Sequence, residues 1–425
     1  MANGDLQDQL ALLRRKIARI DRKFAEPNPP PPVITRPEAP EQYYPEEWLQ
    51  GDEIENQYGR HFQTERIWER HRRHGSMTIC DLEDLPADFL SSISNGEIEH
   101  THPFQWAFLD TETTGLAGGA GTYAFLIGVG RITPEGFRCR QFFMREFGEE
   151  ASLLHALTEH LNQFEVLITY NGKTYDQPLL ETRYRMQRAK PPFSRLVHLD
   201  LLHGARRLWK LRFDSCRLVE LENQILGVER EGDLPGELIP YVYFEYLRTR
   251  EAFKLLPIFH HNAIDILTLA CLTGIVPWAF HSPENARLSH GAEMVGLGRW
   301  LRQAEQYESA LGFFRRAVDR GLADHLLFKT LWDIAALEKK LGRQSSALDV
   351  LTELAGSRNP FRAPAFEELA KHYEHRERNY AMALEMTRSA LEIADCEALR
   401  HRASRLEKRL RVEQTIGLRR LFSAR

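Results

Sequence analysis

The residues from about 104 to 145 constrain the fold most strongly, because three apolar stretches follow one another with turn signals between them. These stretches are QWAFLD, TYAFLIGVGRI and RCRQFFMRE, and glycine- or proline-containing turns lie around them. Successive strands joined by short turns predict an antiparallel meander. A helical pattern at 151–164 and the apolar strand VLITYN come next. We therefore predict an α/β fold in which helices flank a mixed sheet.

Composition narrows the class of protein. The chain has 425 residues and a net charge of −4, so we expect two or three domains and only a local basic surface for any nucleic acid. The five cysteines are widely spaced without a CxxC pair, which argues against a disulfide scaffold or a cysteine zinc site. No apolar run approaches the length of a membrane span. Because the N-terminus is also unlike a signal peptide, we expect a cytoplasmic protein with no membrane partner.

Changes in pattern along the chain predict six segments. They are an amphipathic helix at 1–25, a proline-rich linker at 26–42, an N-terminal extension at 43–103, an α/β domain at 104–281, helical repeats at 285–400 and a basic helical tail at 401–425. The first helix either packs on its own chain or mediates self-association. The extension is expected to pack on the α/β domain, and its charged stretch at 64–76 has a helix-like pattern.

The prediction of repeats rests on three similar helical stretches that have a small residue at the same position. These residues are Ala310, Ala347 and Ala383, which lie 37 and 36 residues apart. Another helical stretch precedes each of them. Paired helices at this period resemble tetratricopeptide repeats, whose typical period is about 34 residues. The resemblance implies an all-α repeat domain that binds a partner protein or extends a nucleic-acid surface.

The sequence FLDTETTGLAGGAGTY places two carboxylates beside a glycine-rich run. Asp110 ends a predicted strand and Glu112 follows two residues later, so both can point to one side of an extended chain. Two carboxylates so close need a cation or a proton between them. The glycines do not match a P-loop or a dinucleotide-binding loop. The run at 115–121 is therefore predicted to form a turn beside a metal-binding pair of carboxylates.

Two further carboxylates stand in comparable settings. Asp176, in YNGKTYD, follows a buried strand and is expected to begin the next helix, where it could also serve as a plain cap. Asp265, in HHNAID, lies in an apolar helical stretch. A buried charge is costly unless it is paired, so Asp265 requires a partner, and a metal ion would supply one.

The stretches FLDTETTG, YNGKTYD and HHNAID, in this order, resemble the three motifs of the DEDD (DnaQ-like) 3′–5′ exonucleases, which have a ribonuclease H-like fold. LENQILG and HNAID make the chain most similar to the YprB-type ribonuclease H-like domain family. This resemblance covers residues 104–281. It implies two Mg²⁺ or Mn²⁺ ions, which suit oxygen ligands. The residues that match the family's metal ligands are Asp110, Glu112, Asp176 and Asp265.

The resemblance also implies a general base five or four residues before the last aspartate. His260 and His261 both meet that spacing. On a continuous helix, His261 lies about 40° from Asp265 around the axis and His260 about 140°. Helical geometry therefore favours His261, whereas a break in the helix before Asn262 would favour His260.

The substrate residues implied by the family motifs are Thr113, Asn171 and Lys173. Arginines and lysines at 183–188 and 206–212 form either a basic track for an anionic strand or ordinary solvated surface. We expect a 3′–5′ exonuclease that acts on single-stranded DNA or RNA. The alternatives are a nucleic-acid-binding scaffold that recruits partners through its repeats and a hydrolase of short nucleotides. The sequence does not distinguish DNA from RNA.

Overall fold

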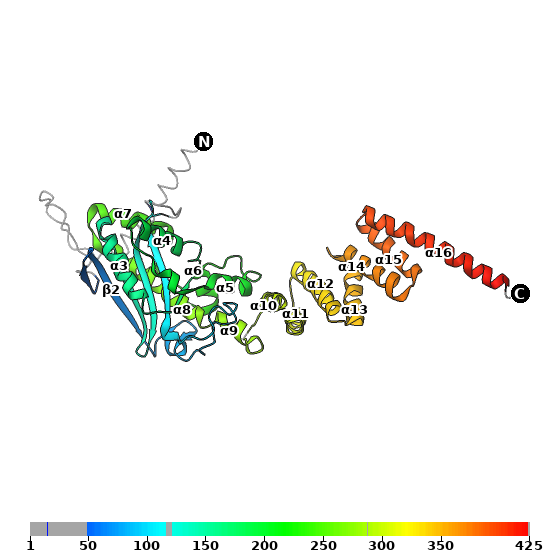
Figure 1. The fold of residues 1–425 in the computed structure, drawn as a ribbon, viewed down its shortest axis with the longest axis horizontal. Helices are drawn as coiled ribbons and strands as arrows, with labels where there is room; N and C mark the ends of the chain where they lie inside the picture. Colours follow the sequence, from blue (N-terminus) through cyan, green and yellow to red (C-terminus); the bar gives the residue numbers. More distant parts are fainter. Residues whose placement is uncertain (1–14, 16–48, 116–120, 287, 424–425) are drawn as a thin grey trace, which may run out of the picture. The chain divides into compact units, whose positions relative to one another are not determined.

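The computed structural model describes residue 15 and residues 49–115, 121–286 and 288–423 (Figure 1). These residues form two compact units. Unit 1 extends to Leu202 and resumes from Arg217 to Pro277, and unit 2 contains His203–Cys216 and the chain from Trp278 onward. The helix predicted at 1–25 and the linker predicted at 26–42 lie outside the described residues, apart from Arg15.

A mixed sheet forms the centre of unit 1. Within the described residues it has seven strands in the order β1-β2-β7-β6-β5-β8-β9. Pairing is antiparallel from β1 through β5 and parallel from β5 through β8 to β9. The strands are β1 (Gly51–Asn56), β2 (Gly59–Glu69), β5 (Trp106–Thr113), β6 (Ala124–Thr133), β7 (Gly136–Phe143), β8 (Val166–Thr169) and β9 (Val197–Asp200). The predicted mixed sheet and the meander β5-β6-β7 are confirmed.

The extension contributes to this sheet instead of forming a helix. The helix-like pattern expected at 64–76 is wrong, because these residues form the end of β2 and the short strands β3 (Arg73–His74) and β4 (Met77–Thr78). Glu65 of β2 has its charged partners on the adjacent strand β7. Glu65 accepts hydrogen bonds from Arg138 at 2.8 Å and from Arg140 at 2.8 Å. Cross-strand ion pairs thus explain charges that the sequence pattern assigned to a helix surface.

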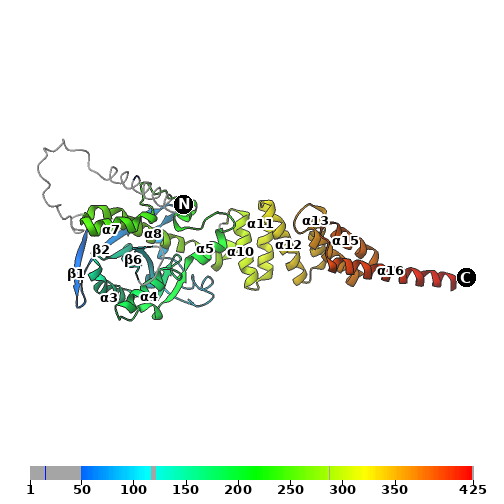
Figure 2. The same ribbon diagram turned by 90° about the horizontal axis from the view of Figure 1, so that it is seen from above.

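Helices cover both faces of the sheet (Figure 2). One face carries α7 and α8, and the other carries α3 and α4. The helices of unit 1 include α3 (Glu150–Leu161), α4 (Asp176–Met186), α6 (Leu218–Leu221), α7 (Ile239–Thr249) and α8 (Leu256–Thr273). The segments α5 (Leu201–Trp209) and α9 (Val276–His281) each cross from one unit to the other.

A glycine on β6 sets the depth at which α8 packs. A Cβ atom at Gly128 would lie 2.2 Å from Ile266 Cδ1 and 2.3 Å from Asn262 Oδ1, both on α8. Any larger side chain would therefore have to displace the Ile266 and Asn262 side chains of α8. Gly128 pairs with Asp110 on β5, so this close approach also brings α8 near the acidic strand.

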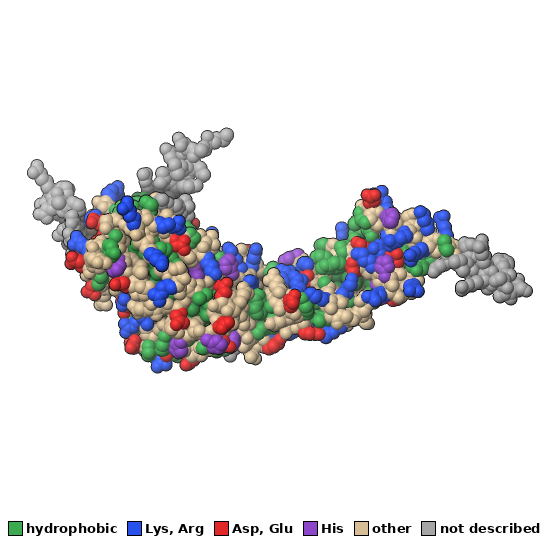
Figure 3. All heavy atoms as spheres, in the orientation of Figure 1, with side chains coloured by type: hydrophobic (Ala, Val, Ile, Leu, Met, Phe, Trp, Pro, Cys, Tyr) green, Lys and Arg blue, Asp and Glu red, His purple; other side chains and the backbone are tan. Residues whose placement is uncertain are grey.

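Unit 2 is helical throughout its described part, as expected. It contains α10 (Gly291–Gln303), α11 (Tyr307–Arg320), α12 (Asp324–Lys340), α13 (Gln344–Gly356), α14 (Arg362–His372), α15 (Tyr380–Ile393) and α16 (Glu397–Ser423). Ala310, Ala347 and Ala383 are each the fourth residue of their helix, and all three are fully buried. The repeated alanine therefore occupies the same packed position in three successive helix pairs. Figure 3 shows Lys and Arg side chains gathered over α15 and α16.

Contrary to the expectation that no apolar run approaches the length of a membrane span, one stretch of the described chain is long and apolar enough to cross a membrane by length and composition alone. It runs from Ala252 to His281 and includes α8, and 78% of its most apolar window is buried inside the fold. Such burial is expected of a helix that packs against a sheet.

Candidate active site

Strand β5 supplies two of the predicted metal ligands, Asp110 and Glu112, which alternate with Thr111 along the strand. Glu112 is buried, and Asp110 is partly exposed. Asn262 on α8 donates its side-chain amide to Asp110 Oδ2 at 2.9 Å. Gln141 fixes the orientation of that amide by donating to Asn262 Oδ1 at 2.9 Å. Burial and the charges of nearby carboxylates raise the pKa of Asp110 well above its usual value.

The third predicted ligand, Asp176, is the first residue of α4, as its sequence setting suggested. Its side chain is buried. Thr111, which lies between the two acidic residues of β5, donates its hydroxyl to Asp176 Oδ1 at 2.5 Å. Burial raises the pKa of Asp176 to about 6, although hydrogen bonds from Thr111 and the backbone oppose the shift. The β5 strand therefore contacts Asp176 directly through its intervening residue.

Helix α8 carries the fourth predicted ligand, Asp265, and the candidate base on one face. His261 and Asp265 are four residues apart, and His261 Nε2 lies 3.6 Å from Asp265 Oδ2. The helix is continuous from Leu256 to Thr273, which is the condition under which the sequence favoured His261. His260 instead has an exposed side chain, and its Nδ1 lies 3.2 Å from Arg66 Nη1 on β2.

The four carboxylates and His261 influence one another's protonation. Burial is the largest influence on Glu112 and raises its pKa to about 8, with the charges of Asp265 and Asp176 adding to the shift. Burial also raises the pKa of Asp265, although His261 and Arg230 oppose it. Burial lowers the pKa of His261, but nearby carboxylates outweigh it and raise the pKa to about 9. These shifts identify Asp110, Glu112, Asp176 and Asp265 as a buried acidic group whose charged forms a nearby cation would stabilise.

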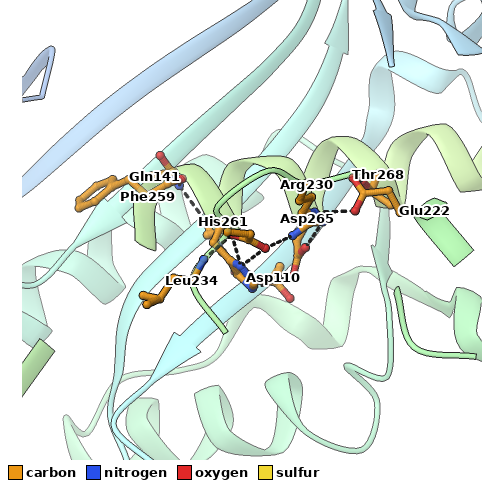
Figure 4. Close-up of polar contacts among 11 residues, drawn as sticks. Asp110, Gln141, Glu222, Arg230, Leu234, Phe259, His261, Asp265 and Thr268 are labelled. Atoms are coloured by element: carbon orange, nitrogen blue, oxygen red, sulfur yellow. Dashed lines mark hydrogen bonds and ion pairs between the residues drawn. The ribbon is translucent and has the colours of Figure 1, made fainter. Parts of the chain in front are cut away.

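Arg230 brings positive charge to this group (Figure 4). Its side chain lies between Glu222 and Asp265, 2.5 Å from an oxygen of each. Glu222 is fully buried, and Thr268 on α8 donates a hydrogen bond to it at 2.7 Å. His74 Nε2 also lies 3.2 Å from Glu222 Oε1. Arg230 is thus anchored by one buried carboxylate while it contacts a predicted metal ligand.

The residues fit a divalent cation in their chemistry. Four carboxylates form an oxygen-only donor set suited to Mg²⁺ or Mn²⁺, and their raised pKa values indicate an excess of negative charge. The carboxylates are, however, further apart than the ligands of a bound ion would be. Across the residues that the structure describes, no three His, Cys, Asp or Glu side chains converge closely enough to hold a metal ion. Arg230 occupies one oxygen of Asp265 in this arrangement.

Of the predicted substrate residues, Thr113 ends strand β5, and Asn171 and Lys173 lie in the loop between β8 and α4. Thr113 donates to the Gly115 carbonyl at 2.8 Å and lies 2.9 Å from the Tyr175 hydroxyl. The backbone N–H groups of Asn171 and Lys173 donate to Asp200 at 2.8 and 3.2 Å. Asp200 also accepts from the Leu202 N–H, so it organises this loop and caps a helix. The 115–121 turn cannot be compared with the prediction, because 116–120 lie outside the described residues.

An open cavity of about 690 Å³ lies beside this loop. It is lined by Lys173 together with Gln177, Glu181 and His198 among other residues. One of the arginines predicted for a basic track, Arg183, is not on the surface. Arg183 is buried and donates to Glu150 at 2.5 Å, which makes it part of the fold and not of an exposed track.

Sequence reasoning missed the residues that support the acidic group. Arg230 and Asp233 lie in the charged loop EREGD, where the pattern gives no reason to distinguish them from solvated surface. Glu222 was noticed only as part of LENQILG. Asn262 lies within the third motif itself, so its position one residue after His261 could have identified it as a partner of Asp110.

Comparison with known proteins agrees with this fold. Residues 107–276 match the model of the RNase_H superfamily, which suggests a nuclease or another nucleic-acid-related activity. The chain is also 31% identical over 351 residues to the uncharacterized protein YprB of Bacillus subtilis (strain 168), covering 79% of this chain and 83% of that protein. The chain belongs to the YprB family.

A solved structure of a family B DNA polymerase from the hyperthermophilic archaeon Pyrobaculum calidifontis is also similar, with 12% sequence identity and a TM-score of 0.32. The match covers 57% of this chain and 34% of the polymerase chain. A similarity this low carries no argument about the activity of this protein.

Proposed function

We propose that the chain is a divalent-metal-dependent nuclease, and specifically a 3′–5′ exonuclease of the DEDD type that acts on single-stranded DNA or RNA. The observation that carries this proposal is the group of four carboxylates from β5, α4 and α8 with one histidine beside it. In particular, Asp265 and His261 lie 3.6 Å apart on α8, and Asp110 is influenced by the charges of Asp265, Glu112 and Asp176.

The chemistry divides between the ions and the chain. Two divalent ions bound by Asp110, Glu112, Asp176 and Asp265 would activate the attacking water and offset charge at the phosphate. Once the ions offset the carboxylate charges that raise its pKa, neutral His261 would accept a proton from that water at Nε2 as the water oxygen bonds to phosphorus and the bond to the leaving 3′ oxygen breaks. The leaving oxygen takes a proton from solvent, and His261 returns its proton to solvent. The loop with Lys173 and Asn171, and the buried Thr113, would orient the strand.

The proposal extends to the organisation of the chain. Residues 104–281 are proposed as the nuclease domain and 43–103 as its extension, with 285–400 as tetratricopeptide-like repeats and 401–425 as a basic tail. Support for the repeats comes from the buried alanines at equivalent positions of α11, α13 and α15. Such repeats present a surface to a protein partner or to nucleic acid.

A second function is favoured by a specific contact. Arg230 donates to Asp265 Oδ1, so a predicted metal ligand already has a cationic partner in the structure. This contact supports the alternative that the chain is a nucleic-acid-binding scaffold with weak or no catalysis, which recruits partners through its repeats. The two functions differ in whether a strand is cut once it is bound.

Hydrolysis of end-labelled strands tests the proposed function. Single-stranded DNA and RNA of one sequence, labelled at the 5′ end, are incubated with the full chain in Mg²⁺, Mn²⁺ or EDTA. Asp110→Ala is compared with Asp84→Ala, since Asp84 is an exposed aspartate of the same unit. We expect the labelled strand to shorten from its 3′ end, with loss of activity in EDTA and in Asp110→Ala only.

Other outcomes would separate the two functions. Equal cleavage by wild type and Asp110→Ala would contradict the nuclease proposal. Strand binding without cleavage in either metal would favour the scaffold. Preference for dinucleotides over long strands would favour a hydrolase of short nucleotides.

A further inference from the structure

The loop between residues 228 and 235 reaches the acidic group through two charged side chains. It follows the π-helical turn Glu222–Leu226, which ends at Gly227 with a φ of 72°. Glycine adopts this left-handed conformation without strain. The chain then turns so that the side chains of Arg230 and Asp233 point into the interior of unit 1. The side chain of Arg230 is 8% exposed and that of Asp233 is 17% exposed. Neither behaves as the solvated surface charge that its sequence setting suggests.

Asp233 contacts one ring nitrogen of the candidate base, His261. His261 Nδ1 lies 2.9 Å from both carboxylate oxygens of Asp233. The other ring nitrogen, Nε2, lies 3.6 Å from Asp265 Oδ2. A distance of 3.6 Å is too long for a hydrogen bond. One nitrogen is therefore engaged by Asp233, and the other is left facing the carboxylates, where it can meet a water molecule.

Arg230 fixes the carboxylate that holds the histidine. It lies 3.2 Å from Asp233 Oδ2, and its other nitrogens contact Glu222 and Asp265. Asp233 Oδ1 also accepts the backbone N–H of Leu234 at 2.9 Å. The Asp233 carboxylate thus has contacts from a buried cation, a backbone amide and the His261 ring. A carboxylate restrained in this way can select the rotamer and tautomer of the imidazole.

We propose that Asp233 is a positioning residue for the nuclease reaction, which holds His261 with its Nδ1 proton donated to Asp233 and its Nε2 directed at the acidic group. This inference rests on the proposed function and deepens it. Arg230, anchored by Glu222, keeps Asp233 in place and leaves Asp265 Oδ2 facing His261 because it occupies Oδ1. The arrangement follows the logic by which an aspartate orients the histidine of a hydrolytic triad.

Substitution of Asp233 tests the positioning role in the full chain. Asp233→Asn keeps the shape of the side chain but removes its charge, and Asp233→Glu restores a carboxylate. Glu231→Gln is the matched control, because it makes the same charge change at an exposed position of the same loop. We expect Asp233→Asn to lower kcat roughly 10- to 100-fold with KM for the strand nearly unchanged. Asp233→Glu should recover part of that loss, and Glu231→Gln should match wild type.

A second readout does not depend on hydrolysis. In protein labelled with ¹⁵N-histidine, the ring signals of His261 are identified by their loss in His261→Gln. We expect a proton on Nδ1 in wild type and in Glu231→Gln, and an altered ¹⁵N pattern in Asp233→Asn. Asp233→Asn should still unfold in one cooperative thermal transition above the assay temperature, which shows that the variant is folded when it is measured.

The two readouts separate the possible failures. Wild-type kcat in Asp233→Asn together with unchanged His261 signals would overturn the positioning role. If wild type cleaves no strand, the proposed function fails, and the His261 signals alone decide whether Asp233 sets the state of the ring. A fall in kcat without any change in those signals, or a loss that Glu does not recover and that follows unfolding, would also count against the proposal.

Discussion

The buried carboxylates of unit 2 and those of the acidic group in unit 1 are held in different ways. In unit 2, Glu374 accepts hydrogen bonds from Arg402 at 2.9 Å and from Arg405 at 2.6 Å. Asp333 accepts from Arg302 and Lys329, each at 2.8 Å. In unit 1, the carboxylates on β5, α4 and α8 are close enough to raise one another's pKa values.

The comparison shows that burial of a carboxylate is not by itself a sign of function. A buried carboxylate with two cationic partners has its charge offset within the fold. Four carboxylates that share one arginine and one histidine have a net negative charge to offset, and a divalent ion would do so. We therefore expect the two regions to respond in opposite ways to the removal of one carboxylate charge.

The largest expected difference is in hydrolysis. Asp265→Asn and Asp333→Asn remove the same charge from a helical aspartate that accepts a hydrogen bond from an arginine. We expect Asp265→Asn to lower the single-turnover rate at least roughly 10²- to 10³-fold, because it removes a predicted metal ligand. Asp333→Asn should stay within a few-fold of wild type per folded molecule. Similar losses in both variants would mean that the two regions do not differ in function.

The next difference is in the stability of unit 2. Glu374→Gln should destabilise the α14–α16 region by about 1–3 kcal/mol, because it leaves Arg402 and Arg405 without their shared carboxylate. The value is at the low end of the range for buried pairs since Arg405 is 43% exposed. Hydrogen–deuterium exchange of α15 measures the change, with exposed Glu385→Gln on the same helix as the control. Unchanged exchange would show that the pairing contributes little.

A neutral side chain at the acidic group should have the opposite effect. Asp110→Asn is expected to raise the free energy of unfolding of unit 1 in divalent-free buffer, because a neutral amide avoids the cost of burying a carboxylate and relieves repulsion from Asp265, Glu112 and Asp176. Urea unfolding followed by a signal from unit 1 provides the measurement. Destabilisation by this variant would indicate that the Asn262 contact matters more than the repulsion.

The smallest expected effect is on how the stability of unit 1 depends on pH. Glu112 has a folded pKa of about 8, raised by burial from 4.5, so the folded state binds more protons than the unfolded state between these values. The charged Glu112 carboxylate therefore destabilises the folded state fully above pH 8, and this destabilisation is relieved as the pH falls. His261, with its pKa raised to about 9, contributes stability that is lost as the pH rises through 9.

These two shifts act in the same direction. We expect unit 1 to unfold at lower urea concentration at pH 9 than at pH 6.5, and Glu112→Gln to reduce that difference. Below pH 6.5 His160 opposes the gain from Glu112, because burial lowers the pKa of His160 to about 3 and the unfolded chain then binds the extra proton. Equal pH dependence in wild type and Glu112→Gln would contradict the assignment of the shift to this group.

Much of the fold could be predicted from local pattern. The meander at 104–145 was predictable because its strands are nearly continuous apolar runs with short turns. Strand β2 was not, because its charges look like a helix surface until Arg138 and Arg140 on β7 are known to lie opposite Glu65. Pairing between strands far apart in sequence leaves no mark in a local pattern.

The candidate site shows the same limit. Helical spacing was sufficient to favour His261 over His260, because both the histidine and Asp265 lie on one continuous helix. Arg230 and Asp233 were not predictable, since their roles depend on a loop that returns to α8 from about 30 residues earlier in the chain. Tertiary contacts between a loop and a helix decide which charges are buried.

Binding of Mn²⁺ to the full chain tests the central claim most directly, namely that the acidic group of unit 1 is a divalent-cation site. Calorimetric titration and the Mn²⁺ electron paramagnetic resonance signal count the bound ions without any substrate. We predict that wild type and Asp333→Asn bind up to two ions per chain, and that Asp110→Asn and Asp265→Asn lose this binding. Mn²⁺ binding that persists unchanged in both acidic-group variants, or wild type that binds no Mn²⁺ at millimolar concentration, would contradict the account.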